Sequence, residues 1–135
     1  MIKSGATTGN IAMVETDEEF NIWSPLAVIR VNEDIVLPKY AFYYMKSMNF
    51  FESVKLGWSY GTQQNIGMGV IENLLFCIPN NIDDQEQIVE YLDKKIAETN
   101  ETVQIIKDEI ELLKEYKETL IYEVITGKID VRAEL

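Results

Sequence analysis

The chain has 135 residues, of which 47% are hydrophobic and 26% charged, and its formal net charge at pH 7 is −11. This length accommodates one modest domain, or a small domain with an extension, and no apolar run reaches the roughly 18 residues of a membrane span. The absence of histidine excludes Ser-His-Asp and Cys-His catalysis and histidine-dependent zinc sites. The first residues lack the apolar stretch of a signal peptide, and a single cysteine excludes an internal disulfide, so we expect a cytoplasmic protein.

The negative charge is concentrated toward the C-terminus. Residues 1–79 contain 5 lysines and arginines and 8 aspartates and glutamates, whereas residues 80–135 contain 7 and 15. A net charge of this sign argues against an autonomous DNA-binding domain. Because the front of the chain is only weakly acidic, it is still able to approach a phosphate backbone locally.

The front of the chain has the pattern of short strands separated by turns. A turn-rich run at 4–9 precedes expected strands at 11–14 and 26–31, with an alternating apolar and polar segment at 20–23. Pro38 suits the first position of a helix, and the residues after it predict one amphipathic helix that ends near Phe51. Its aromatic side chains are interpreted as core residues that pack on a sheet, with a ligand site as the alternative.

The next segment, 55–65, has the glycines and amides of a polar loop, interrupted by two large aromatic residues. A short helical turn is expected near 70–73, followed by a strand at 74–78. Cys77 lies within that apolar strand, so the pattern favours a buried small hydrophobe over a reactive thiol.

From Asp83 the hydrophobic period changes to that of a long helix. Asp83 or Asp84 is expected to cap it, and Gly127 to end it near Ile125. Apolar residues alternate at steps of three and four, which defines a heptad. The a positions are Val89, Ile96, Val103, Ile110, Lys117 and Val124, and the d positions are Leu92, Thr99, Ile106, Leu113 and Leu120.

A rod of about 40 residues, roughly 60 Å at ~1.5 Å per residue, is too long to bury its seam against one small domain. The heptad therefore predicts a partner helix, and the alternative is an amphipathic helix packed on its own domain. The seam residues that we expect to pair are Leu92, Ile96, Val103, Ile106, Ile110, Leu113 and Leu120.

Several segments resemble the DNA specificity subunits of type I restriction–modification systems. At the end of a recognition domain of that family, a strand that ends in proline leads into a Glu-Gln-x-x-Ile helix start, and 78–79 followed by 84–88 is similar. The closing run 124–132, Val-Ile-Thr-Gly-Lys-Ile-Asp-Val-Arg, resembles the end of the family's conserved region. The segments 4–12 and 61–66 are also similar to recurring elements of these recognition domains.

The resemblance implies an α+β fold: a small, incomplete target-recognition domain at 1–82, one long coiled-coil spacer helix at 83–126, and a tail at 127–135. A complete domain of the family would contain several more strands before Ser4, so we expect this chain to begin partway through one. The family implies a non-catalytic role without cofactor or metal. Its implied partners are double-stranded DNA, the modification (methyltransferase) subunit, and a second specificity half or a second copy bound through the long helix.

The candidate DNA contacts follow from chemistry as well as resemblance. Amide side chains hydrogen-bond well to adenine edges, and cationic or amphipathic side chains contact the DNA backbone. The candidates are Thr62, Gln63, Gln64 and Asn65 for bases or phosphates, and Lys3, Lys55 and Trp58 for the backbone. Because the same polar run recurs in the family whatever the target, a purely structural role in turns and caps remains the alternative.

Two other functions compete with DNA recognition. The acidic balance favours a coiled-coil assembly or decoy module that does not itself bind DNA. A fragment of a methyltransferase or nuclease is disfavoured, because the chain has no Asn-Pro-Pro-aromatic motif and no glycine-rich cofactor loop.

Overall fold

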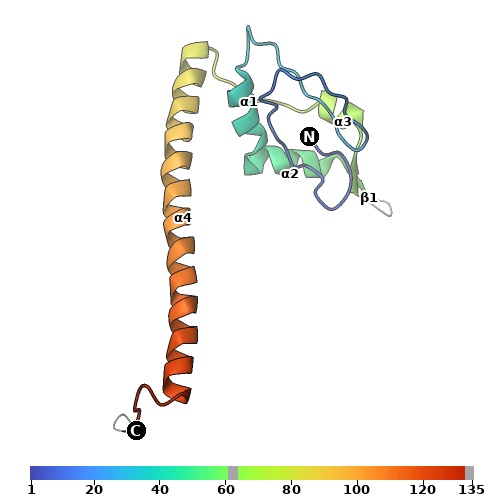
Figure 1. Cartoon of the computed structure of the whole chain (residues 1–135). Helices are drawn as coiled ribbons and strands as arrows, with labels where there is room; N and C mark the ends of the chain where they lie inside the picture. The colour runs from blue at the N-terminus through green and yellow to red at the C-terminus, as the bar shows by residue number, and fades with distance from the viewer. Residues whose placement is uncertain (61–63, 133–135) are drawn as a thin grey trace. The chain divides into compact units, whose positions relative to one another are not determined.

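The computed structural model describes residues 1–60 and 64–132 and divides into two compact units, Met1–Tyr91 and Leu92–Leu135. The first unit, called the head below, contains short helices, a two-stranded sheet and the first turns of a long helix. Figure 1 shows this helix, α4 (Ile82–Ile125), as one uninterrupted element. The predicted α+β class with one long helix near the end of the chain is confirmed.

The helix expected after Pro38 is in fact two helices, α1 (Pro38–Met45) and α2 (Met48–Leu56). Pro38 occupies the first position of α1, as predicted. The break falls at Ser47, whose hydroxyl oxygen accepts a hydrogen bond from the backbone N–H of Phe50 at 3.3 Å. The prediction of one continuous helix was wrong because a serine N-cap starts a new helix here.

An antiparallel hairpin follows α2 and consists of β1 (Trp58–Tyr60) and β2 (Gln64–Ile66). The loop expected over 55–65 is therefore wrong in part, since Trp58–Tyr60 and Gln64–Asn65 lie in strands. Trp58 lies opposite Ile66, which is almost fully buried and anchors the hairpin to the core. Helix α3 (Met68–Glu72) then confirms the helical turn expected near Val70.

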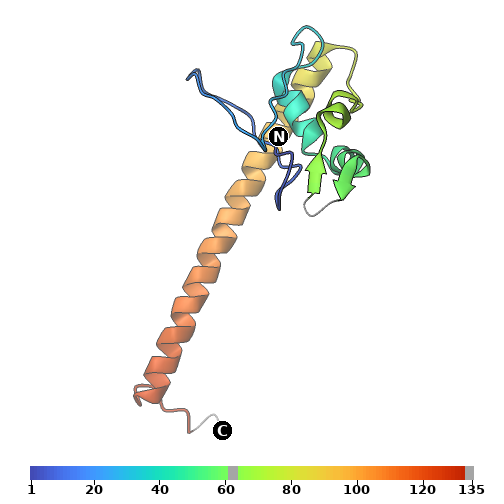
Figure 2. The same ribbon diagram turned by 90° about the vertical axis from the view of Figure 1, so that its right-hand side faces the viewer.

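Three segments expected to be strands, 11–14, 26–31 and 74–78, belong to no sheet in the described part of the chain. Leu26 makes an isolated antiparallel bridge with Ile2, and alternate side chains of each segment are more buried than their neighbours. Burial alternates along these segments with the period of extended backbone. The strand prediction was wrong because a strand also requires a hydrogen-bonded neighbour. Residues 20–23 lie on the exposed loop that extends away from the helices in Figure 2.

The core of the head joins α1, α2 and the hairpin. It is formed by six buried residues, Val36, Ala41, Met45, Phe50, Val54 and Ile66. Aromatic residues of α1 and α2 belong to this packing: the ring centroid of Tyr44 in α1 lies 4.9 Å from that of Phe76, and the ring centroid of Phe50 in α2 lies 5.6 Å from it. These ring contacts hold segment 74–78 against the head, where a sheet had been expected to hold it.

Two tyrosine hydroxyls fix that same segment. Tyr40 donates a hydrogen bond to the carbonyl oxygen of Cys77 at 3.0 Å, and Tyr44 donates to that of Leu75 at 3.3 Å. Burial is the largest of the causes that raise the pKa of Tyr40, so this hydroxyl remains a donor well above neutral pH. The side chain of Cys77 is exposed, which corrects the prediction of a buried cysteine, because the alternation turns residues 75 and 77 outward.

The start of α4 is anchored by two polar residues. Asn81 precedes the helix, and its side-chain oxygen accepts a hydrogen bond from the backbone N–H of Asp83 at 3.0 Å, so the expected aspartate cap was misplaced. Gln85 is fully buried in the head. Its side chain accepts a hydrogen bond from the Leu37 N–H and donates to the carbonyl oxygens of Ile35 and Pro79, at 3.0 to 3.1 Å.

The end of α4 is defined by Gly127, as predicted. Its φ of +74° is a conformation that glycine adopts without steric cost. The N–H of Gly127 bonds to the carbonyl oxygen of Val124, and the N–H of Lys128 bonds to that of Glu123. These two bonds form a Schellman motif, which satisfies carbonyl groups that the end of a helix would otherwise leave open.

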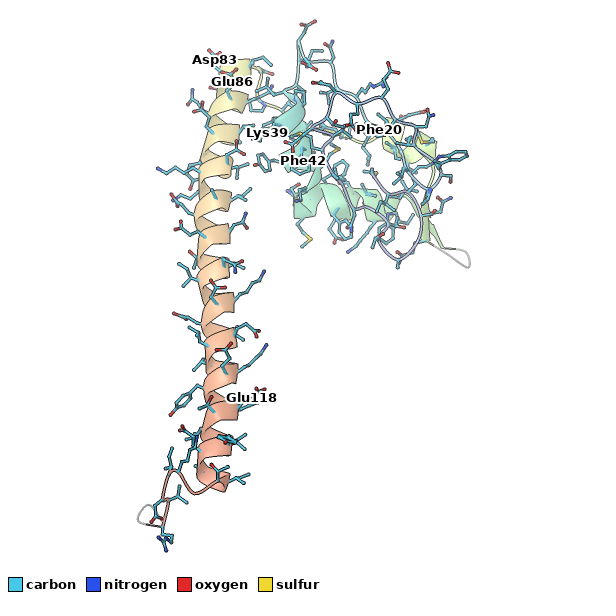
Figure 3. All side chains as sticks on the ribbon, viewed as in Figure 1. Phe20, Lys39, Phe42, Asp83, Glu86 and Glu118 are labelled. Atoms are coloured by element: carbon cyan, nitrogen blue, oxygen red, sulfur yellow. The ribbon has the colours of Figure 1, made fainter. Side chains whose placement is uncertain are left out.

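The second unit exposes the predicted seam. Ile96, Val103, Ile106, Ile110, Leu113 and Leu120 are between 38% and 66% exposed, and Leu92 is half-buried. Figure 3 shows side chains that project from every side of this part of α4, Glu118 among them. Val89, the first a position, is instead buried in the head. The seam available to a partner helix therefore begins at Leu92.

Candidate nucleic-acid interface

The hairpin brings two of the four polar candidates together at one edge of the head. Gln64 and Asn65 are adjacent on β2, and both side chains are exposed. Asn65 pairs across the sheet with Ser59, and Gln64 pairs with Tyr60. Because neighbouring strand residues point to opposite faces, Asn65 lies on the face opposite to buried Ile66. Thr62 and Gln63 lie outside the described residues.

The first residues of the chain lie along the other side of β2. The N–H of Ile66 bonds to the carbonyl oxygen of Lys3 at 2.7 Å, and the N–H of Gly5 bonds to that of Gln64 at 3.3 Å. Ser4 forms an isolated bridge with Asn65. Backbone contacts therefore hold the segment of Lys3 beside β2, although 60 residues separate Lys3 from Gln64 in the sequence.

Lys55 and Trp58 form a second cluster with Phe51. The Lys55 ammonium lies 4.7 Å from the centre of the Phe51 ring, and Phe51 packs edge-on against Trp58 at 5.8 Å. Lys55 also forms an ion pair with Glu52 at 2.6 Å, and both side chains are more than a third exposed. An exposed pair of this kind contributes about 0–1 kcal/mol, so a phosphate competes with it readily.

Trp58 is half-buried and packs against the core, so its ring serves the fold as well as the candidate surface. Its neighbour on the other side is the turn at 5–9. Gly9 has a φ of +92°, and a Cβ added there would lie 2.9 Å from the Phe51 ring. This close approach lets the turn lie on α2, and it places Thr8, whose hydroxyl donates to the Gly5 carbonyl, in a buried position.

A hollow of about 480 Å³ lies between this turn and the junction of α1 and α2. Sequence reasoning missed it, because its walls come from segments more than 30 residues apart. Its polar lining residues include Asn10, Lys46 and Ser47. The Lys46 ammonium lies 5.0 Å from the Phe42 ring, which adds a cation to this side of the head.

Neither a metal centre nor a membrane segment is found in the described ranges. No group of three or more cysteine, aspartate or glutamate side chains there is placed to hold a metal ion. Within the same ranges, no helix combines the length and the apolar character that are needed to cross a membrane.

Comparison with protein families matches residues 1–112 to the family described as the type I restriction modification DNA specificity domain. The match covers the whole head and the first 31 residues of α4. No curated protein and no solved structure matches the chain. The matched segment contains every described candidate contact, and the likeness to this family rests on the sequence alone.

Proposed function

Because this chain belongs to the family of type I restriction–modification DNA specificity domains, we propose that it is the DNA sequence-specificity component of such a complex. In this role it is non-catalytic and cytoplasmic, and it positions modification and restriction subunits on a split DNA target. The observation that carries the proposal is β2, whose Gln64 and Asn65 are both exposed, on opposite faces of the strand, within the matched segment. Backbone contacts hold the segment of Lys3 beside this strand.

The two clusters divide the labour of DNA binding. Exposed amides satisfy paired donor and acceptor positions on adenine, and a well-placed amide discriminates against a wrong base by about 1–3 kcal/mol. Lys3 and Lys55 are suited to phosphates, which position a protein without conveying sequence. Trp58 packs against Phe51, whose ring lies beneath the Lys55 ammonium, and in this way helps to position Lys55. The Trp58 ring also adds surface that contacts the DNA backbone.

Selection from a library of random duplex DNA tests this function, with the full chain and the modification subunit present. We expect an enriched motif and an affinity that falls steeply with salt. The double variant Gln64→Ala/Asn65→Ala should relax the motif at one or more positions. Lys55→Ala should weaken binding to all sequences alike and lower the salt slope by about one.

Lys94→Ala is the matched control, because Lys94 is an exposed lysine on α4 outside the candidate surface. It should change neither the motif nor the slope. An unenriched library, with DNA retention that is independent of salt, would contradict the proposal. That outcome would favour the alternative, an assembly or decoy module, which the net charge of −11 supports.

The long helix provides the assembly function. Its exposed aliphatic seam is suited to the spacer helix of a second specificity half or to a second copy of this chain. A further apolar stripe, Ile105, Leu112 and Tyr116, is 53–65% exposed on a different face of α4. Because the seam is already assigned to a second helix, we assign this stripe to the remaining implied partner, the modification subunit. Light scattering of mixtures tests the assignment: Ile105→Ser/Leu112→Ser should abolish capture of that subunit without changing self-association.

A further inference from the structure

We propose the register of that helix pairing: in an antiparallel pair of two copies of this chain through α4, Thr99 of each copy lies opposite Lys117 of the other. The inference rests on the seam pairing of the proposed function and names its partner and geometry. It follows from two polar residues within an otherwise aliphatic seam, and from the place where that seam becomes available.

The orientation follows from Lys117. In a parallel pair in register, each a position meets its own copy, so two Lys117 ammonium groups would be held together in the seam. In an antiparallel pair, a positions face d positions, and Lys117 is able to meet a neutral residue instead. No ion pair of Lys117 is found in the described part of the chain. Its ammonium is exposed to solvent, so only pairing through the seam decides which group it meets.

The register follows from Thr99. Thr99 and Lys117 are the two seam residues that are not aliphatic, and each lies nine residues from Asp108. An antiparallel pair whose two helices cross at Asp108 therefore sets Thr99 of one copy opposite Lys117 of the other. The Thr99 hydroxyl already donates to the carbonyl oxygen of Lys95 at 2.7 Å, so its oxygen is oriented to accept a hydrogen bond from the Lys117 ammonium. The remaining layers of this register are aliphatic: Leu92 with Val124, Ile96 with Leu120, Val103 with Leu113, and Ile106 with Ile110.

A shift of one heptad toward the head removes this match. Lys117 would then face Leu92, and Thr99 would face Ile110, so each polar group would be set against an aliphatic side chain. Leu120 would require Val89, which is 9% exposed because the head already covers it. The Asp108-centred register instead uses the seam from Leu92 to Val124, all of which lies in the second unit.

The charged residues that flank the seam contribute attraction and repulsion in nearly equal measure, so the seam residues determine the register. At the g positions, Lys95 of one copy faces Glu123 of the other. Near the centre, Lys107 and Glu109 each approach their own copies on opposite edges of the pair. Lys95 is now paired with Glu98 at 2.7 Å and at least half of its side chain is exposed, so exchange for Glu123 is nearly neutral.

Distances between spin labels in the full chain test the register. Single variants Glu101→Cys, Asp108→Cys and Glu115→Cys place labels on the outer face of α4, in a Cys77→Ser background because Cys77 is exposed. At ~1.5 Å per residue, the proposed register offsets the two labels along the axis by about 21 Å at 101, 0 Å at 108 and 21 Å at 115. The shifted register gives about 10, 10 and 32 Å, and a parallel pair gives no offset at any site.

Equal distances at 101 and 115, both longer than at 108, support the proposal. Unequal distances at 101 and 115 would overturn the register while leaving seam pairing intact. Three equal distances would exclude the antiparallel orientation. Absence of dipolar coupling would exclude pairing with a second copy, and selection on DNA would still decide the proposed DNA function separately.

A double-mutant cycle gives a second test that does not depend on labels. If Thr99 and Lys117 share a layer, the double variant Thr99→Val/Lys117→Leu should associate more tightly than the sum of the single variants indicates. We expect a coupling of roughly fivefold or more in the dimer Kd. Additive effects would overturn the pairing of these residues, and the matched pair Thr102→Val/Lys114→Leu, outside the seam, should be additive.

Discussion

Gln85→Ala is expected to destabilise the head more than any other single change of an uncharged polar side chain in α4. The Gln85 side chain is fully buried and makes three hydrogen bonds, to the backbone of Leu37, Ile35 and Pro79. Alanine would leave one N–H and two carbonyl groups without this partner in a site that water enters poorly. Each unsatisfied buried group costs about 1–3 kcal/mol, so a total loss of about 3 kcal/mol is expected after partial relaxation.

Urea unfolding followed by the fluorescence of Trp58, which is half-buried in the head, measures this loss. With a slope of roughly 1–1.5 kcal/mol/M for a unit of this size, the midpoint should fall by about 2–3 M. Gln87→Ala is the control, since Gln87 is exposed on the same helical turn and alanine has the higher helix propensity. Equal midpoints for the two variants would refute the role assigned to Gln85.

Three further results are expected. Gly57→Ala should destabilise the head by about 1–3 kcal/mol, because its Cβ would lie 2.3 Å from Val70, whereas Gly69→Ala in α3 meets open space and should be neutral or stabilising in thermal unfolding. Ile106→Asp/Ile110→Asp should abolish self-association in sedimentation, and an unchanged molecular weight would contradict the seam. The pure chain should transfer no methyl group from S-adenosylmethionine to duplex DNA until the modification subunit is added, and activity of the chain alone would contradict the non-catalytic assignment.

The long helix was predictable because its signals are local. The heptad lies within one segment, and Gly127 supplies the positive φ that ends the helix. The exact start was harder, since Asn81, Asp83 and Asp84 all make suitable caps, and only the structure shows that Asn81 is used. Competition among similar residues within one turn leaves such a boundary ambiguous by a few residues.

The apolar pattern of the head was predictable from the sequence, but which of its segments pair as β-strands was not. Residues 26–31 and 74–78 alternate as strands do, yet they are held by side chains and by isolated backbone contacts. Conversely, β1 and β2 form in a segment with the composition of a loop, because Ile66 is drawn into the core. Strand formation depends on distant partners, and no local window contains them.

The candidate site shows the same limit. The amides were identified from their chemistry, but the neighbourhood of Lys3 arises from backbone bonds across the chain. The burial of Gln85 was also hidden, although it lies in the helix start on which the family resemblance partly rests. A glutamine among charged residues is typical of an exposed helical face, and only the approach of the segments before α1 and α4 buries it.

A net charge of −11 and a DNA-binding role are compatible because electrostatic contact is local. At physiological salt the screening length is about 8 Å, so acidic residues beyond that distance in solvent contribute little at the hairpin edge. Much of the acidity of the head lies in the exposed loop at 15–19, and the rest of the excess lies on α4. With Lys3 and Lys55 as the proposed phosphate contacts, we expect the DNA affinity of this chain alone to depend only weakly on salt. On the proposed function, strong DNA binding would therefore require cations from another subunit, so we expect specificity in this chain to depend on its assembly with a partner.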